Sequence, residues 1–219
     1  MRERHHDRSE GVEGLLMSKS KPIETIYNGY RFRSRLEARW AVFFDNIGIQ
    51  YEYEPEGLMV LNGQWYLPDF YLTQFHCYFE VKRAPEKIDR GSLPYDEFSE
   101  AIEKIGYGSY TDSWAGIIAF GDPYDHYMWI FCQDISDNSA GSYDSPCVFG
   151  LYGNSPILVS WDDWRDRRYV TSFDTCEDIP MFPGPSDGSN PYLTEKLIEA
   201  ELKARQARFE HGETPIKGR

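Results

Sequence analysis

Two acidic residues and a lysine near the middle of the chain have the types and spacing of a hydrolytic centre. Pro68-Asp69 is followed, after ten residues, by Glu80-Val81-Lys82. Two carboxylates that meet in a half-buried site repel each other unless a proton or a cation lies between them. Oxygen ligands favour a hard ion such as Mg²⁺ or Mn²⁺. A bound ion polarises a phosphoryl oxygen and lowers the pKa of a bound water, and an amine beside it stabilises the charge that develops on the phosphate. The pattern therefore predicts a phosphodiesterase centre.

The strands on either side of residues 73–74 must bring these side chains together. The sequence predicts one or two strands over 58–72 and another over 75–82. With a two-residue turn at 73–74, residue 69 pairs with residue 78. Opposed residues share a face, as do residues two apart on one strand, so Asp69 and Glu80 become diagonal neighbours about 7–8 Å apart at Cβ. A three-residue loop would move one strand's set to the other face. The side chains expected on the common face are those of Asp69, Tyr78, Glu80 and Lys82.

A helix is expected before these strands. Ser34 is a good N-cap residue, Glu37 three positions later completes a capping-box pattern, and Gly48 ends the helix. Upstream, Asn28-Gly29 between β-type flanks predicts a tight hairpin. The helix would carry an apolar stripe formed by Leu36, Trp40, Phe43, Phe44 and Ile47.

The remaining elements are predicted by periodicity and composition. Alternation predicts a strand over 49–54, and apolar runs predict neighbouring strands over 114–120 and 127–132. A helix is expected over 95–105. Residues 193–210 predict a charged helix with a thin apolar stripe, typical of a solvated or partner-facing element. The expected organisation is a disordered tail over 1–20, one domain over 21–190 with its core in 24–132, and a charged helix and tail over 191–219; residues 134–190, rich in Gly, Pro, Ser and Asp, give no clear assignment.

Pro-Asp, a spacer and Glu-x-Lys form a pattern that resembles the PD-(D/E)XK nuclease superfamily. These nucleases also tend to carry a Glu on the helix before the motif strands, and Glu37 in Ser34-Arg-Leu-Glu-Ala-Arg-Trp40 matches that position. The run from Arg33 to Lys82 looks most like phage endonuclease I-type junction-resolving enzymes and the nuclease subunits of some transposases. The resemblance covers about residues 24–132. It implies an α/β fold with a restriction-endonuclease-like core, a mixed central sheet flanked by helices, and an irregular acidic extension over 133–190.

The resemblance also implies an activity, metal-dependent hydrolysis of DNA phosphodiester bonds by an endonuclease of phage or mobile-element type. Asp69 and Glu80 would be ligands of Mg²⁺ or Mn²⁺, with the Val81 carbonyl as a further ligand. Lys82 would help to activate the water, and Glu37 would support a second metal or its water. Charge clustering adds a set of arginines expected to contact the DNA backbone, Arg31, Arg33, Arg35, Arg39 and Arg83.

Charge and composition limit the classes of protein to consider. The chain has 219 residues and a net charge of −13, and residues 91–190 alone hold 17 acidic and 4 basic residues. The N-terminal half is near neutral, so net charge does not exclude a nucleic-acid partner. The chain contains no apolar run near the roughly 20 residues that span a bilayer and no apolar leader after its charged start, so we expect a cytoplasmic protein without a membrane partner. The four cysteines are too far apart for a zinc motif.

Simpler interpretations of the same residues stand beside these. Pro-Asp alone is a common turn dipeptide, and capping fully explains Glu37. The arginines of 31–39 equally offset Glu24, Glu37 and Asp45 as a solvated face. A different class of function is a non-catalytic interaction protein whose acidic segment mimics DNA or docks a basic partner, and a third is a nuclease subunit active only in a larger assembly. Symmetric cuts need two centres, which is compatible with a homodimer or a larger nucleoprotein assembly.

Overall fold

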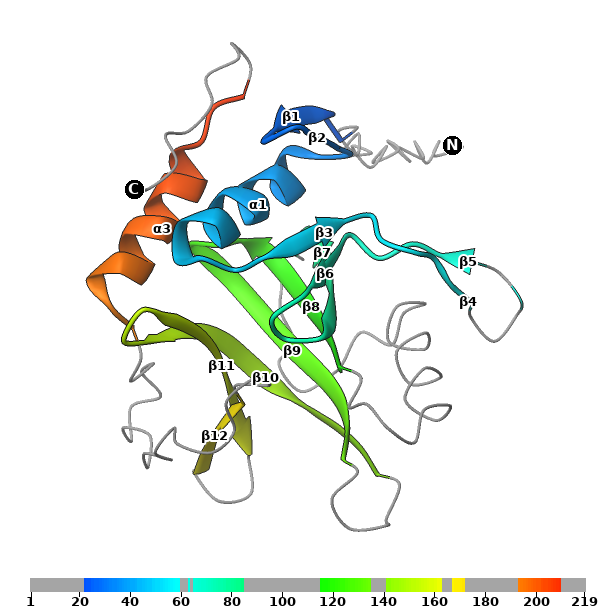
Figure 1. Ribbon diagram of the computed structural model, residues 1–219, viewed down its shortest axis with the longest axis vertical. Helices are drawn as coiled ribbons and strands as arrows, with labels where there is room; N and C mark the ends of the chain where they lie inside the picture. Colours follow the sequence, from blue (N-terminus) through cyan, green and yellow to red (C-terminus); the bar gives the residue numbers. More distant parts are fainter. Residues whose placement is uncertain are drawn as a thin grey trace, which may run out of the picture.

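The computed structural model describes residues 22–59, 63, 65–84, 115–134, 141–162, 167–171 and 193–209. These residues form an α/β structure with a large mixed sheet and two helices (Figure 1). Neither helix has the length and apolar composition needed to span a bilayer. The elements are β1 (Thr25–Tyr27), β2 (Tyr30–Phe32), α1 (Arg35–Ile47), β3 (Tyr51–Tyr53), β4 (Leu58–Met59), β5 (Trp65–Tyr66), β6 (Phe70–Leu72), β7 (Cys77–Lys82), β8 (Ala115–Asp122), β9 (Asp125–Asp134), β10 (Gly141–Tyr152), β11 (Ser155–Asp162), β12 (Arg167–Thr171) and α3 (Glu195–Gln206).

The main sheet has eight strands in the order β12-β11-β10-β9-β8-β7-β6-β3. Every neighbouring pair is antiparallel except β7 and β8, which run parallel. The sheet is therefore mixed, and the α/β class expected from the sequence is confirmed. Two short hairpins, β1-β2 and β4-β5, form separate sheets, and the second projects away from the body of the molecule in Figure 1.

Local signals in the sequence determine helix α1. The Ser34 side chain accepts a hydrogen bond from the Glu37 amide at the N-terminus, and Gly48 ends the helix in the left-handed conformation at φ 86°. A residue with a Cβ is strained at that φ, which explains the glycine. Both predicted ends are confirmed, as is the Asn28-Gly29 turn, whose residues have φ of 48° and 87°.

The apolar stripe of α1 packs on one face of the sheet. Trp40 contacts Phe79 of β7 at 4.9 Å between ring centroids, and Phe44 contacts the same ring at 5.2 Å. Phe149 of β10 contacts Phe44 as well, so the core joins strands distant in the sequence. Because side chains alternate along β7, the face opposite Phe79 carries Glu80 and Lys82, which belong to the site described below.

The C-terminal helix belongs to this core, contrary to the solvated or partner-facing role predicted for it. Helix α3 lies along α1 (Figure 1) and buries Leu197, Ala200 and Ala204 against it. Two of these three residues are alanines, which allow a close helix approach but make only a thin apolar stripe. Most charged residues of α3 are exposed on its outer face. Their number led to the prediction of a solvated or partner-facing helix.

Strands β10, β11 and β12 occupy part of the segment that gave no sequence assignment. They extend the sheet by successive antiparallel pairing from β9. The predicted helix over 95–105 and the tail over 1–20 lie outside the described residues, as does the whole region from 172 to 190.

The turn between β6 and β7 differs from the prediction. Leu72 pairs with Cys77, so the loop contains the four residues 73–76 and not two. His76 has a positive φ of 47°, and the buried Phe75 belongs to the turn, not to the strand. Both loop lengths are even, so the change moves the pairing along β7 by two residues and leaves the faces as predicted.

Candidate active site

The end of the β6-β7 ladder brings Asp69 opposite Glu80. Phe70 pairs with Phe79, so the next position along the register opposes residues 69 and 80. The Asp69 amide donates to Glu80 Oε2 at 3.3 Å, and Asp69 Oδ2 accepts from the Val81 amide at 2.7 Å. Asp69 thus contacts Glu80 directly across the strands, one step closer than the diagonal arrangement predicted from a two-residue turn.

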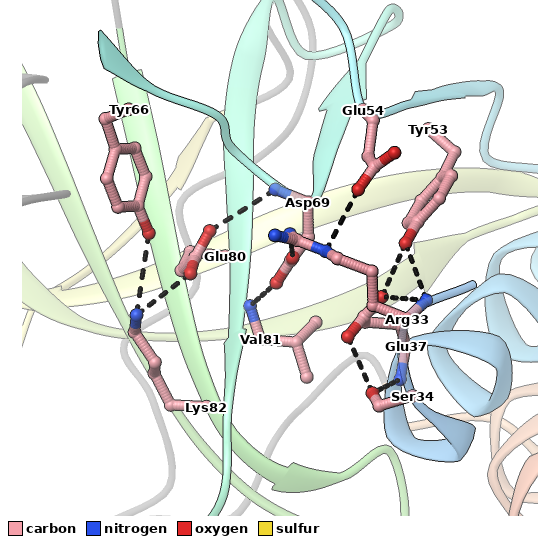
Figure 2. A network of polar contacts seen from close by, with 10 residues as sticks. All are labelled: Arg33, Ser34, Glu37, Tyr53, Glu54, Tyr66, Asp69, Glu80, Val81 and Lys82. Atoms are coloured by element: carbon pink, nitrogen blue, oxygen red, sulfur yellow. Dashed lines mark hydrogen bonds and ion pairs between the residues drawn. The ribbon is translucent and has the colours of Figure 1, made fainter. Parts of the chain in front are cut away.

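Lys82 completes one side of the site. Its Nζ lies 2.9 Å from Glu80 Oε1 and 3.5 Å from the hydroxyl of Tyr66 on β5. About a third of the Lys82 side chain is exposed, whereas the Glu80 side chain is only 7 % exposed. The amine therefore lies at the surface of the site with the carboxylate beneath it, and Figure 2 shows both beside Tyr66.

Arg33 approaches Asp69 from the opposite side. Its Nη2 donates to Asp69 Oδ1, and its Nε lies 2.9 Å from Oε1 of Glu54. The Glu54 amide also donates to the Asp69 carbonyl at 2.9 Å, which ties the end of β3 to the residue that Arg33 contacts. Asp69 consequently lies between two groups of polar side chains, as Figure 2 shows.

Glu37 joins this network through the N-terminus of α1. Its Oε1 accepts from the Ser34 hydroxyl at 2.6 Å, and its Oε2 accepts from the Tyr53 hydroxyl at 2.7 Å and from the Arg33 amide at 3.1 Å. The capping box is therefore modified: the glutamate takes the amide of the residue before the N-cap. Burial raises the pKa of Tyr53, and its hydrogen bond to Glu37 adds to that shift, so the tyrosine stays a donor.

The carboxylates of this region are buried and close enough to interact. Asp69, Glu80 and Glu37 are 3 %, 5 % and 8 % exposed. Burial, followed by the charges of Glu80 and Glu37, raises the pKa of Asp69 to about 7, while the Val81 amide and Arg33 act in the opposite direction. A carboxyl whose pKa is raised toward neutrality by burial, with neighbouring carboxylates adding to the shift, is typical of a functional site.

The donor set suits a hard divalent cation. Asp69 and Glu80 supply only oxygen, and a cation between them would relieve the repulsion that raises the pKa of Asp69. Magnesium binds through one or two carboxylates and completes its coordination with water and substrate oxygens. Within the described ranges, no three His, Cys, Asp or Glu side chains gather closely enough to form a larger ligand group. The two facing carboxylates are therefore the residues that would hold a metal ion.

The structure brings some of the predicted site residues together and leaves others apart. Asp69, Glu80, Val81 and Lys82 come together, and Glu37 joins them through Arg33 and Tyr53. Tyr78 shares the strand with Glu80 and stacks against Tyr71, outside the network. Three further residues of the network were not predicted, Tyr53, Glu54 and Tyr66.

The predicted DNA-contacting arginines have different surroundings. Arg31 is exposed and lies 3.5 Å from Glu24, as a solvated pair would. Arg33 contacts Asp69 and Glu54 inside the site. Arg39 Nη1 lies 3.5 Å from Asp122 at the end of β8, and Arg83 is exposed just beyond β7. Arg35 is half-buried in the first turn of α1.

Comparisons of the chain with protein-family models, with curated proteins and with solved structures gave no match.

Proposed function

We propose that the protein is a metal-dependent nuclease that hydrolyses DNA phosphodiester bonds. The observation that carries the proposal is that Glu80 accepts from both the Asp69 amide and the Lys82 amine, with the carboxylates of Asp69 and Glu80 buried and the amine at the surface. The resemblance of Pro68-Asp69 and Glu80-Val81-Lys82 to the PD-(D/E)XK pattern supports DNA as the substrate.

Each residue has a role that follows from its contacts. Asp69 and Glu80 would hold Mg²⁺ or Mn²⁺, whose chemistry is to polarise the phosphoryl oxygen and to lower the pKa of a bound water. Lys82, positioned by Glu80 and Tyr66, would orient the attacking water and stabilise negative charge on the phosphate. The Val81 carbonyl and Glu37 remain proposed as further ligands.

Two arginines are available for the DNA backbone. Arg31 and Arg83 are exposed, and the partner of Arg31 among the described residues is the exposed Glu24. Surface pairs of this kind are worth little, so a phosphate can replace the carboxylate. We propose them as backbone contacts that position the duplex without reading its sequence.

A cleavage assay tests this function. Duplex, single-stranded and four-way-junction DNA are incubated with the protein and Mg²⁺ or Mn²⁺, with and without EDTA. We expect cleavage that leaves 5′-phosphate and 3′-hydroxyl ends, stops in EDTA and falls about 10²–10⁴-fold in Lys82→Ala. Lys203→Ala, on the exposed side of α3 with a weak pair to Glu199, is the matched control and should cleave like the wild type.

Absence of metal-dependent cleavage on every substrate would contradict the proposal. If the protein then competed with DNA for a basic protein, the alternative of an acidic interaction protein would replace it. Full activity of Lys82→Ala would place the chemistry elsewhere in the molecule.

A further inference from the structure

Both oxygens of the Asp69 carboxylate accept hydrogen bonds from the chain itself. Oδ2 takes the Val81 amide, which the parallel pairing of β7 with β8 fixes in place. Oδ1 takes the guanidinium of Arg33, whose side chain is 51 % exposed. One contact is therefore part of the sheet, whereas the other comes from a long side chain that reaches in from the surface.

A second carboxylate holds the same guanidinium. Glu54 Oε1 lies 2.9 Å from Arg33 Nε, and the Glu54 side chain is itself a third exposed. Arg33 thus bridges a buried carboxylate and a more solvated one. It has an anionic partner to keep if its contact with Asp69 is lost.

This arrangement matters for a cation at Asp69. A guanidinium and a divalent ion repel each other, so binding both at the same carboxylate oxygen is unfavourable. Without either of them, a buried ionised carboxylate would be left uncompensated, which is strongly unfavourable. The side chain that neutralises Asp69 in the metal-free protein is therefore a competitor of any ion that binds there.

We propose that Arg33 is an internal counter-ion of Asp69, which a divalent cation displaces when it binds between Asp69 and Glu80. The inference rests on the proposed nuclease function and deepens it. Arg33 keeps its contact with Glu54 after displacement, so metal binding breaks only one of the two ion pairs that Arg33 makes with Asp69 and Glu54. Arg33 is then a positioning residue that lowers metal affinity and keeps the empty site ordered.

Metal binding without DNA tests the proposal. Electron paramagnetic resonance of free Mn²⁺ at pH 8 gives the dissociation constant for Mn²⁺ of the 219-residue chain. Arg33→Gln removes the competitor and should bind Mn²⁺ about tenfold more tightly, the equivalent of about 1.4 kcal/mol. Arg208→Gln is the matched control, because Arg208 is an exposed arginine just after α3 and lies outside the proposed site; the affinity of this variant for Mn²⁺ should equal that of the wild type.

A second measurement does not depend on whether Arg33→Gln folds. In ¹⁵N-arginine-labelled wild-type protein, Mg²⁺ should move the side-chain signals of Arg33 and leave those of Arg31 in place. Unmoved Arg33 signals at saturating Mg²⁺, or an Arg33→Gln affinity equal to or weaker than that of the wild type, would overturn the proposal.

The failure of this inference differs from failure of the nuclease function. Mg²⁺-dependent cleavage by a wild-type protein whose Arg33→Gln variant binds Mn²⁺ no more tightly would leave the nuclease intact and make Arg33 a permanent structural ion pair. No Mn²⁺ binding by either protein, together with no cleavage, would overturn both.

Discussion

The two parts of the described structure bury different kinds of residue. In residues 22–84, the buried side chains include Thr25, Glu37, Asp69 and Glu80 among the apolar ones. In the described parts of 115–171 and 193–209, the buried side chains are hydrophobic, as on β8, β10 and α3. One sheet and one core join these parts, so the difference is not a difference between domains.

The contrast agrees with the place of the proposed functional site. Buried ion pairs are often no more stabilising than hydrocarbon of the same volume, and a lone buried charge is strongly unfavourable. Among the described side chains of strands β8 to β11, those that are buried are hydrophobic. We therefore attribute the burial of Asp69, Glu80 and Glu37 to the proposed chemistry and not to stability.

The largest effect on stability is expected in the hydrophobic part. Phe149 is 3 % exposed and contacts the rings of Phe43, Phe44, Phe75 and Phe79. Phe149→Ala should lower the free energy of unfolding by about 3–5 kcal/mol, measured in urea, because it removes apolar area and leaves a cavity. Cleavage per folded molecule should change little.

Phe149→Leu is the control for this substitution, since it preserves most of the apolar volume. It should be destabilised much less than Phe149→Ala. Equal losses of unfolding free energy in the two variants, or a loss below about 1 kcal/mol for Phe149→Ala, would mean that this ring does not stabilise the packing between the two parts of the structure.

A smaller effect is expected from the buried carboxyl. The pKa of Asp69 is raised from 3.8 to about 7 by burial and neighbouring charge, so the folded protein holds a proton that the unfolded chain releases above about pH 4. The free energy of unfolding should therefore fall as pH rises from 4.5 to 7.5 in EDTA, by at most about 3 kcal/mol from this group. Asp69→Asn has no carboxyl group at this position, so this decrease in the free energy of unfolding should be absent from the variant.

Urea unfolding of both proteins at several pH values measures the difference. Glu199→Gln, an exposed substitution on α3, should keep the wild-type profile. If the stability of wild-type protein relative to Asp69→Asn rose with pH across this window, Asp69 would be a well-paired carboxylate of low pKa. The burial of Asp69 would then be no cost to stability, and the two parts of the structure would differ less in what their buried residues contribute.

Local signals made the N-terminal part predictable. Ser34 and Gly48 determine the ends of α1 through their own backbone chemistry, and Asn28-Gly29 does the same for the first hairpin. The convergence of Asp69, Glu80 and Lys82 was also predictable, because strand alternation depends only on whether the loop is odd or even. The predicted length of this loop was wrong because residues 73–76 include no glycine. The positive φ of His76 therefore has no signal in the sequence.

Long-range pairing made the rest harder to predict. Residues 141–162 form β10 and β11 by pairing with β9 and with each other, although their composition is that of loops. Tyr66 and Glu54 reach the site from β5 and from the end of β3, and their sequence neighbours do not indicate those contacts. Alternation along 49–54 was the one available signal for Tyr53, whose hydroxyl meets Glu37.

We propose that the buried pair Asp69 and Glu80 serves metal-dependent hydrolysis, and the Glu80→Gln variant is the sharpest test of this role. Glutamine keeps the shape and can accept from Lys82, so the fold should be retained, with a melting temperature close to that of the wild type. Glu52→Gln, an exposed change on β3, is the control. We predict at least a hundredfold loss of Mg²⁺-dependent DNA cleavage, on the order of 3 kcal/mol in the barrier, for Glu80→Gln alone. Wild-type cleavage by a folded Glu80→Gln variant would contradict the account.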